Sequence, residues 1–259
     1  MIPAWIELEG AHNARDMGGL TTPDGPTRSG VLLRSDALDQ LTPGDVERLT
    51  EVVGLSHVID LRSGSERERR GRGLLGGTGI RYSELEIIGV DDMTRRQGER
   101  ETAVAAGRPT AEIMSDGYVE LLALGGQSFS TAFRRILEPG GSPVLVHCAA
   151  GKDRTGVMIA LLLDVAGVDR ADIIADYAAT DGRMAPILER FGVGASYEQA
   201  NRPDDAAARV PAFVFGAQAD TMAHFVRHLD TTWGGGAGYL RGHGITDDEL
   251  AAWRTLFVG

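Results

Sequence analysis

The spacing of hydrophobic residues predicts alternating strands and helices in the first part of the chain. Residues 30–34 (Gly-Val-Leu-Leu-Arg) and 55–61 (Leu-Ser-His-Val-Ile-Asp-Leu) are short apolar runs typical of buried strands, and residues 80–88 form a third candidate. Between the first two, Thr42 and Pro43 predict the start of a helix, as N-cap and first helical residue. This order predicts an α/β domain with a central, mostly parallel sheet flanked by helices.

The rest of the chain combines helical periodicity with one more strand. Apolar residues recur at helical spacing over residues 113–122 and again over 129–137, which predicts two amphipathic helices. Residues 143–147 predict a strand, and the helix after it, over residues 155–166, is apolar nearly all round and is expected to be buried. Further helices are predicted from Asp169 to Tyr177, over 221–231, and after the capping box of Thr246 and Glu249.

Two polar stretches interrupt this pattern. Residues 89–110 are rich in Arg and Glu, residues 192–215 are rich in Gly, Ala, Pro and Asp, and neither shows clear periodicity. We interpret both as flap insertions near the functional site. Because no stretch has the composition of a linker, the sequence predicts one domain over residues 1–259.

Charge and composition exclude several classes of partner. The hydrophobic content of 42% and charged content of 24% are those of an ordinary globular protein, and the net charge is −11. Such a charge opposes binding to nucleic acids and to anionic membranes. No apolar run is long enough for a membrane helix, and the first residues lack the pattern of a signal peptide, so we expect a cytoplasmic protein without stable membrane insertion.

The single cysteine and the single lysine of the chain lie four positions apart. Cys148 and Lys152 both belong to the sequence Leu145-Val-His-Cys-Ala-Ala-Gly-Lys-Asp-Arg-Thr-Gly156. One cysteine cannot form an internal disulfide, and no Cys/His cluster indicates zinc, so neither a metal nor a cofactor is expected. High Arg usage fits a coding bias, but the position of the one lysine calls for an explanation.

The segment from Cys148 to Arg154 (the loop, below) has the features of an anion site. It joins a predicted strand to the N-terminus of a buried helix, where free N–H groups and the helix dipole attract an anion. We expect Ala149, Ala150 and Gly151 to line the site, and Arg154 to bind two phosphate oxygens.

The same surroundings predict a reactive cysteine. They should lower the pKa of Cys148, so that a thiolate is available to attack phosphorus. Thr155 can donate a hydrogen bond to the thiolate when it departs. The alternative is that Cys148 is only a buried residue at the end of a strand.

The loop resembles a known signature. His147-Cys-Ala-Ala-Gly-Lys-Asp-Arg-Thr-Gly156 is similar to the signature loop of the cysteine-dependent protein tyrosine phosphatase superfamily, in the form of its bacterial atypical branch. Asn13-Ala-Arg-Asp-Met-Gly-Gly19 resembles the N-terminal motif of that branch, with Ala14 in place of an aromatic residue. Four more segments agree, namely residues 33–38, 59–63, 176–177 and 239–250. The resemblance implies a tyrosine-phosphatase-like fold and hydrolysis of phosphate monoesters through a phosphocysteine.

A phosphatase of this kind needs a general acid, and the sequence offers several. Asp153 lies in the loop, and the resemblance favours it. Asp60 ends a strand expected beside the strand that precedes the loop, at the edge where sites of α/β proteins form. Asp60 could instead orient Arg154 or form a salt bridge with Arg62. Asp91 or Asp92 in the first flap is a third choice.

Three further segments are candidates for substrate binding. Lys152 could meet a second phosphate or the leaving group, as the resemblance also implies, or it could be a solvated surface residue. Arg62 is a candidate because it follows the strand that Asp60 ends. Asn13, Arg15 and Asp16 could line the site or tie down the N-terminus. The run from Glu66 to Arg72 is either a solvated helix face or a region that attracts acidic or phosphorylated substrates.

These observations predict a phosphatase acting on phosphotyrosine, with phosphoserine, phosphothreonine or phosphoinositides as further substrates. The expected partners are a phosphorylated protein, lipid or small molecule, and phosphate or vanadate ions in the loop. The alternatives are a phosphatase of a small metabolite, such as a nucleotide or sugar phosphate, and a catalytically dead phosphate-binding module. The sequence does not predict an oligomeric state.

Overall fold

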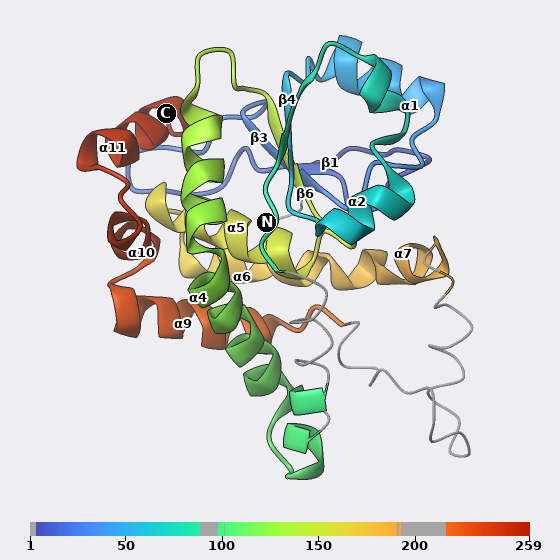
Figure 1. The fold of residues 1–259 in the computed structure, drawn as a ribbon. Helices are drawn as coiled ribbons and strands as arrows, with labels where there is room; N and C mark the ends of the chain where they lie inside the picture. Colours follow the sequence, from blue (N-terminus) through green and yellow to red (C-terminus); the bar gives the residue numbers. More distant parts are fainter. Residues whose placement is uncertain (1–3, 89–97, 101, 191, 193–215) are drawn as a thin grey trace.

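The computed structural model describes residues 4–88, 98–100, 102–190, 192 and 216–259 (Figure 1). Six strands form one sheet in the order β1-β2-β3-β6-β4-β5. The four strands from β3 to β5 are parallel, whereas β1 and β2 add an antiparallel edge. The prediction of a mostly parallel sheet flanked by helices is therefore confirmed. The strands are β1 (Ala4–Trp5), β2 (Arg15–Asp16), β3 (Leu32–Ser35), β4 (His57–Asp60), β5 (Arg81–Glu84) and β6 (Val144–His147).

The central strand β6 positions the loop that follows it. β6 pairs with β3 on one side and β4 on the other, so that Ser35, His147 and Asp60 lie in register at the carboxyl ends of the three strands. All residues of these strands are buried, including polar ones such as Arg34, Ser35 and Asp60 near their carboxyl ends. The loop therefore begins at the middle of one sheet edge, where α/β proteins bind ligands.

The two faces of the sheet pack against different helices. Side chains alternate along each strand: Val144 and Val146 belong to the larger hydrophobic cluster, while Leu145 between them belongs to the smaller one. The smaller cluster lies under α1 (Pro43–Glu47) with its continuation, the π-helix η1 (Arg48–Val52), and the 3₁₀ helix η2 (Gly73–Gly77). The larger cluster contains helices α4 (Thr110–Leu137), α5 (Asp153–Val165), α6 (Arg170–Ala179), α9 (Ala219–Trp233), α10 (Gly236–Gly242) and α11 (Asp247–Phe257).

Three shorter elements lie near the loop or beside these helices. They are α2 (Gly64–Arg70), directly after β4, and the pair η3 (Asp181–Arg183) and α7 (Met184–Arg190) after α6. The predicted N-cap at Thr42 and the predicted capping box at Thr246 are present: each threonine accepts a hydrogen bond from the N3 backbone of the helix that follows.

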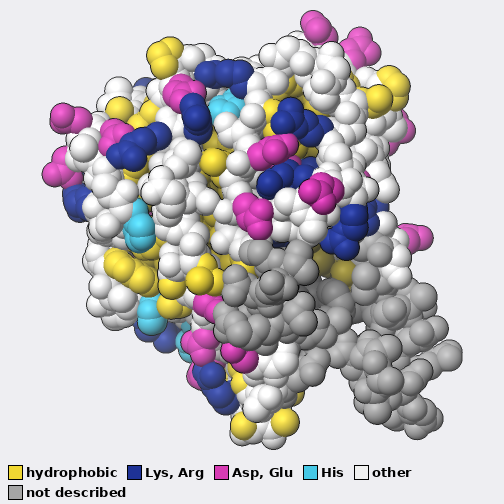
Figure 2. All heavy atoms as spheres, in the orientation of Figure 1, with side chains coloured by type: hydrophobic (Ala, Val, Ile, Leu, Met, Phe, Trp, Pro, Cys, Tyr) yellow, Lys and Arg dark blue, Asp and Glu magenta, His cyan; other side chains and the backbone are white. Residues whose placement is uncertain are grey.

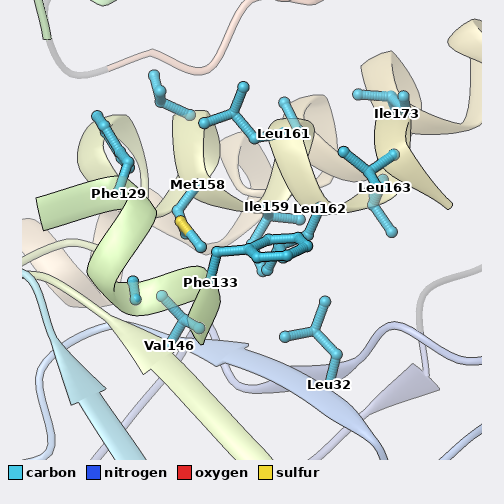
Figure 3. Packing of buried hydrophobic residues seen from close by; sticks show 14 of the residues in the cluster. Leu32, Phe129, Phe133, Val146, Met158, Ile159, Leu161, Leu162, Leu163 and Ile173 are labelled. Carbon is cyan, nitrogen blue, oxygen red and sulfur yellow. The ribbon is translucent and has the colours of Figure 1, made fainter. Parts of the chain in front are cut away.

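The helix α4 corrects one prediction. The two amphipathic helices expected over 113–122 and 129–137 are one helix of 28 residues. Gly125 and Gly126 in its middle allow close packing: an added Cβ would lie 2.8 Å from Ile87 and 2.1 Å from His243. Figure 3 shows the side chains of Phe129 and Phe133 in the core between α4 and α5. The two glycines therefore serve helix packing within one continuous helix.

Most of the predicted flaps lies outside the described residues. Within the first, residues 98–100 and 102–105 are helical, which corrects the expectation of an irregular segment throughout. Alanines at 103 and 105 favour this helix. Of the second flap, only residue 192 is described. In the described segments, no helix combines the length and apolar character needed to span a membrane.

Candidate active site

The loop turns sharply between β6 and α5. Gly151 has a φ of +66°, and a Cβ at this position would lie 2.4 Å from the backbone oxygen of Ser35. Only glycine avoids both the strained conformation and the clash. Gly151 thus lets the loop pass close to the end of β3 before α5 begins at Asp153.

Hydrogen bonds hold the carbonyl groups of the loop. Asn13 Nδ2 donates to the oxygens of Ala150 and Gly151, at 3.1 and 3.2 Å, and Arg34 Nη2 donates to Gly151 O at 2.6 Å. The backbone N–H groups of residues 149–151 have no acceptor among the described residues. Since the carbonyls are occupied and these N–H groups are available, the loop can receive an anion.

Arg15 lies in the network that supports the loop. Its guanidinium donates to Asp176 Oδ1 at 2.7 Å, to Thr180 Oγ1 at 3.1 Å and to Asn13 Oδ1 at 2.5 Å. Asp176 also pairs with Arg34. All of these side chains are buried. These contacts tie the N-terminal motif to the residues of α6 and to Thr180 after it, as one of the two alternatives for Arg15 expected.

Cys148 is the first residue of the loop and is only 2% exposed. Thr155, on the first turn of α5, has a buried hydroxyl that finds no hydrogen-bond partner in the described part of the chain. A buried hydroxyl without a partner is costly unless a ligand or a charged group completes it. The role predicted for Thr155, as a donor to the Cys148 thiolate, requires an available hydroxyl of this kind.

Arg154 is held by an ion pair that the sequence analysis missed. Its Nη1 and Nη2 donate to the two carboxylate oxygens of Glu66, at 2.6 and 2.9 Å. Burial alone would lower the pKa of Arg154, but the Glu66 hydrogen bonds and the Cys148 charge raise it. Burial opposes the charge of Glu66 as well, yet Arg154 holds the pKa of Glu66 at about 2. Both groups are therefore charged at neutral pH.

Glu66 reaches Arg154 because of its place in α2. It is the N3 residue of a capping box with Ser63, which fixes the start of α2 directly after β4. The Ser-x-x-Glu spacing was visible in the sequence and could have indicated an anchored carboxylate. For the run from Glu66 to Arg72, the sequence analysis had offered two other interpretations, a solvated helix face or a region that attracts substrates.

Asp153, the favoured acid, is bound by two neighbouring groups. Tyr118 on α4 donates to Asp153 Oδ1 at 2.6 Å, and Lys152 Nζ lies 3.5 Å from the same oxygen. Burial disfavours the charged carboxylate, but the Lys152 charge and the Tyr118 hydrogen bond outweigh it, so the pKa of Asp153 is lowered. Sequence reasoning placed Tyr118 on a helix but assigned it no part in the site.

Lys152 is buried, with 2% of its side chain exposed. Its Nζ donates to the backbone oxygen of Gly216 at 3.2 Å, and burial lowers its pKa. The alternative of a solvated surface lysine is therefore wrong. The ammonium group instead connects the loop to the start of the segment that leads into α9.

Asp60 and Arg62 pair with each other. Arg62 Nη2 lies 2.7 Å from Asp60 Oδ2, which also accepts a 2.9 Å hydrogen bond from Tyr82. Arg62 Nη2 also donates a hydrogen bond of 2.8 Å to the backbone oxygen of Gly71. Burial works against ionisation of Asp60, yet His147 and Arg62 lower its pKa far below the usual range. The geometry thus shows the salt bridge with Arg62 that was one of the alternatives for Asp60.

The remaining acid candidates, Asp91 and Asp92, lie outside the described residues. Over the ranges that are described, no cluster of His, Cys, Asp and Glu side chains could hold a metal ion.

Comparison with known proteins places this site in a family. Residues 6–259 match the family described as "Tyrosine phosphatase family". The triple specificity protein phosphatase PtpB of Mycobacterium tuberculosis is 30% identical over 98% of this chain and 99% of its own length. A tyrosine-protein phosphatase of Nostoc commune is also 30% identical, over 85% of this chain and 71% of its own.

Solved structures show a more distant likeness. The core catalytic domain of the PP-IP phosphatase SIW14 from S. cerevisiae aligns with 60% of this chain and 74% of its own, at 18% identity and a TM-score of 0.37. The sequence matches span nearly the whole chain and carry the assignment. The chain belongs to the tyrosine phosphatase family and is a phosphoric monoester hydrolase.

Proposed function

We propose that this phosphatase acts on phosphotyrosine through a phosphocysteine intermediate, with Cys148 as nucleophile and Asp153 as general acid. The observation that carries the proposal is the arrangement of the loop. Its carbonyls are bonded to Asn13 and Arg34, its N–H groups are available, and Arg154 is fixed by Glu66 beside it. Such an arrangement is preorganised for the equatorial oxygens of a phosphoryl group.

In the first step the Cys148 thiolate attacks phosphorus. The S–P bond forms as the bond between phosphorus and the leaving oxygen breaks, and Asp153 transfers its proton to that oxygen. The lowered pKa of Asp153 belongs to the free protein, in which Lys152 and Tyr118 favour the carboxylate. A phosphate dianion in the loop is a like charge that raises this pKa and supports protonation.

In the second step a water molecule attacks the phosphocysteine. Asp153, now ionised, takes the proton of the water, and the S–P bond breaks to release inorganic phosphate. The departing thiolate is stabilised by the Thr155 hydroxyl, whose hydrogen-bonding capacity is otherwise unused within the described residues. No oxidant or metal is needed for either step.

The family relationship supports phosphotyrosine as the substrate class. The Nostoc commune relative is named a tyrosine-protein phosphatase, and the Mycobacterium tuberculosis relative is named a triple specificity protein phosphatase. Phosphoserine, phosphothreonine and phosphoinositides remain further candidates for this chain.

The test compares wild type with Cys148→Ser. Wild type should hydrolyse p-nitrophenyl phosphate and a phosphotyrosine peptide, while the variant should retain only trace turnover and still bind the peptide. Substantial turnover by the variant would rule out the phosphocysteine. Preference for nucleotides or sugar phosphates over the peptide would change the substrate class and leave the mechanism intact.

A further inference from the structure

A cleft of about 570 Å³ opens beside the loop. It is lined by a residue of the loop, a residue that follows β3, and residues in and just before α2, namely Ala149, Ala37, Arg62, Glu66, Arg69 and Arg70. Three of these six residues are arginines, in a chain whose net charge is −11. The proposed phosphoryl transfer uses none of the three. Their concentration next to the loop therefore indicates a second task.

The three arginines differ in how their charges are compensated. Arg62 pairs with Asp60, and Arg70 Nη1 lies 3.5 Å from Asp39 Oδ2. Arg69 is exposed, and its Nε donates to the backbone oxygen of Ser65 at 3.2 Å. No carboxylate pairs with Arg69 in the part of the chain that the structure describes. Arg69 is thus an exposed cation of this cleft that can receive an anion from solution.

We propose that this cleft binds the carboxylate of an acidic residue beside the phosphotyrosine of a peptide substrate, with Arg69 as the main contact. The proposal rests on the phosphotyrosine activity proposed above. Ala149 follows Cys148 directly, so a group in the cleft lies next to the bound phosphoryl group. Neighbouring residues of an extended peptide are about 3.3–3.6 Å apart along the chain, which suits this proximity. The guanidinium of arginine pairs with a carboxylate through two parallel hydrogen bonds.

The surroundings favour a peptide over an anionic membrane surface. Glu84 of β5 stands among arginines in and just after α2: Arg67 Nε lies 3.5 Å from Glu84 Oε2, and Arg72 Nη2 lies 2.8 Å from Glu84 Oε1. Figure 2 shows basic and acidic side chains interleaved on this part of the surface. A flat anionic surface would meet both signs of charge and a strongly negative molecule. A single carboxylate on a peptide, in contrast, can contact Arg69 without meeting the acidic side chains nearby.

The experiment measures kcat/KM for two phosphotyrosine peptides that differ only in Glu or Gln beside the phosphorylated residue. Wild type should prefer the Glu peptide by about 3- to 5-fold at low salt, as expected for one exposed ion pair. The preference should disappear in Arg69→Gln, reverse in Arg69→Glu, and shrink as salt is added. Arg227→Gln, an exposed arginine of α9 with the same change in net charge, should keep it.

Other results would overturn the subsite. Equal kcat/KM values for the two peptides in wild type would do so, and so would a preference that persists in Arg69→Glu. Sensitivity to Arg69→Glu seen only with a bisphosphorylated inositol lipid would assign the cleft to another substrate class. Turnover of p-nitrophenyl phosphate without turnover of either peptide would reject phosphotyrosine as substrate, and the subsite with it.

Discussion

The hydroxyl of Tyr118 donates a 2.6 Å hydrogen bond to Oδ1 of Asp153, across the junction between α4 and α5. Tyr177 places its own hydroxyl 2.6 Å from that of Tyr118. Burial, together with the Asp153 charge, raises the pKa of Tyr118 well above its usual value, so the hydroxyl stays a donor throughout the working range of pH. The bond fixes one oxygen of the proposed acid and leaves Oδ2 for proton transfer.

Replacing Tyr118 by Phe should therefore change the pH dependence of catalysis. The hydrogen bond stabilises the ionised carboxylate, so its loss raises the pKa of Asp153. Because the acid must be protonated, kcat falls as pH rises past this pKa, and in Tyr118→Phe that fall should move to higher pH. The measurement is kcat against pH for wild type, Tyr118→Phe and Tyr177→Phe, in which the effect should be smaller. If wild type and Tyr118→Phe gave the same dependence of kcat on pH, Tyr118 would not influence the pKa of the general acid.

The choice between Asp153 and Asp60 can be tested with leaving groups. A general acid contributes about 10²- to 10⁴-fold, and more when the leaving group is a poor one. Asp153→Asn should lower kcat strongly for phosphotyrosine and less for p-nitrophenyl phosphate, whose leaving group departs without protonation. Asp60→Asn breaks a buried salt bridge and should lower the melting temperature, with similar effects on the two substrates. The opposite assignment follows if only Asp60→Asn shows the leaving-group dependence.

The ion pair between Glu66 and Arg154 should be needed for activity. Glu66→Gln keeps the shape of the side chain but removes the charge that orients the guanidinium. A displaced catalytic group can cost on the order of 10²-fold in rate, so we expect a loss of kcat/KM of roughly this size. Glu68→Gln, an exposed residue on the same helix, is the matched control and should behave as wild type. Equal activity of the two variants would contradict the orienting role.

The same ion pair should contribute stability that depends on pH. The pKa of Glu66 is lowered from 4.5 to about 2, so its contribution is present above pH 4.5 and is lost as pH falls toward 2. A shift of this size corresponds to on the order of 3 kcal/mol at neutral pH. Thermal unfolding of wild type and Glu66→Gln should differ most above pH 5, and the difference should close in acid. A gap that stays constant down to pH 2 would be inconsistent with this ion pair.

The sequence predicted the parts of the fold that depend on local patterns. The buried strands of the sheet, the N-cap at Thr42 and the capping box at Thr246 follow from residues that lie next to each other in the chain. The single helix α4 was not predictable in this way. The segment that joins the two expected helices contains Gly125 and Gly126, and these pack closely against Ile87 and His243, which are distant in sequence.

The candidate site shows the same division. Cys148 and Arg154 form one contiguous motif with a strand before it and a helix after it, so the loop could be located from the sequence. Glu66 and Tyr118 come from other elements, and their roles depend on hydrogen bonds to Arg154 and Asp153 across the fold. Spacing along the chain carries no information about such contacts. The salt bridge between Asp60 and Arg62 was one of several alternatives that the sequence offered for Asp60.

The proposed phosphocysteine can be trapped directly. Wild type is mixed with ³²P-labelled phosphotyrosine peptide, quenched within one turnover, and digested, and the labelled fragment is identified by mass spectrometry. The mechanism predicts one labelled peptide, with phosphate on the sulfur of Cys148. It predicts no label in Cys148→Ser, and loss of the label from wild type when excess unlabelled substrate is added before the quench. Turnover of the labelled substrate without any covalent label, or with the label on another residue, would contradict it.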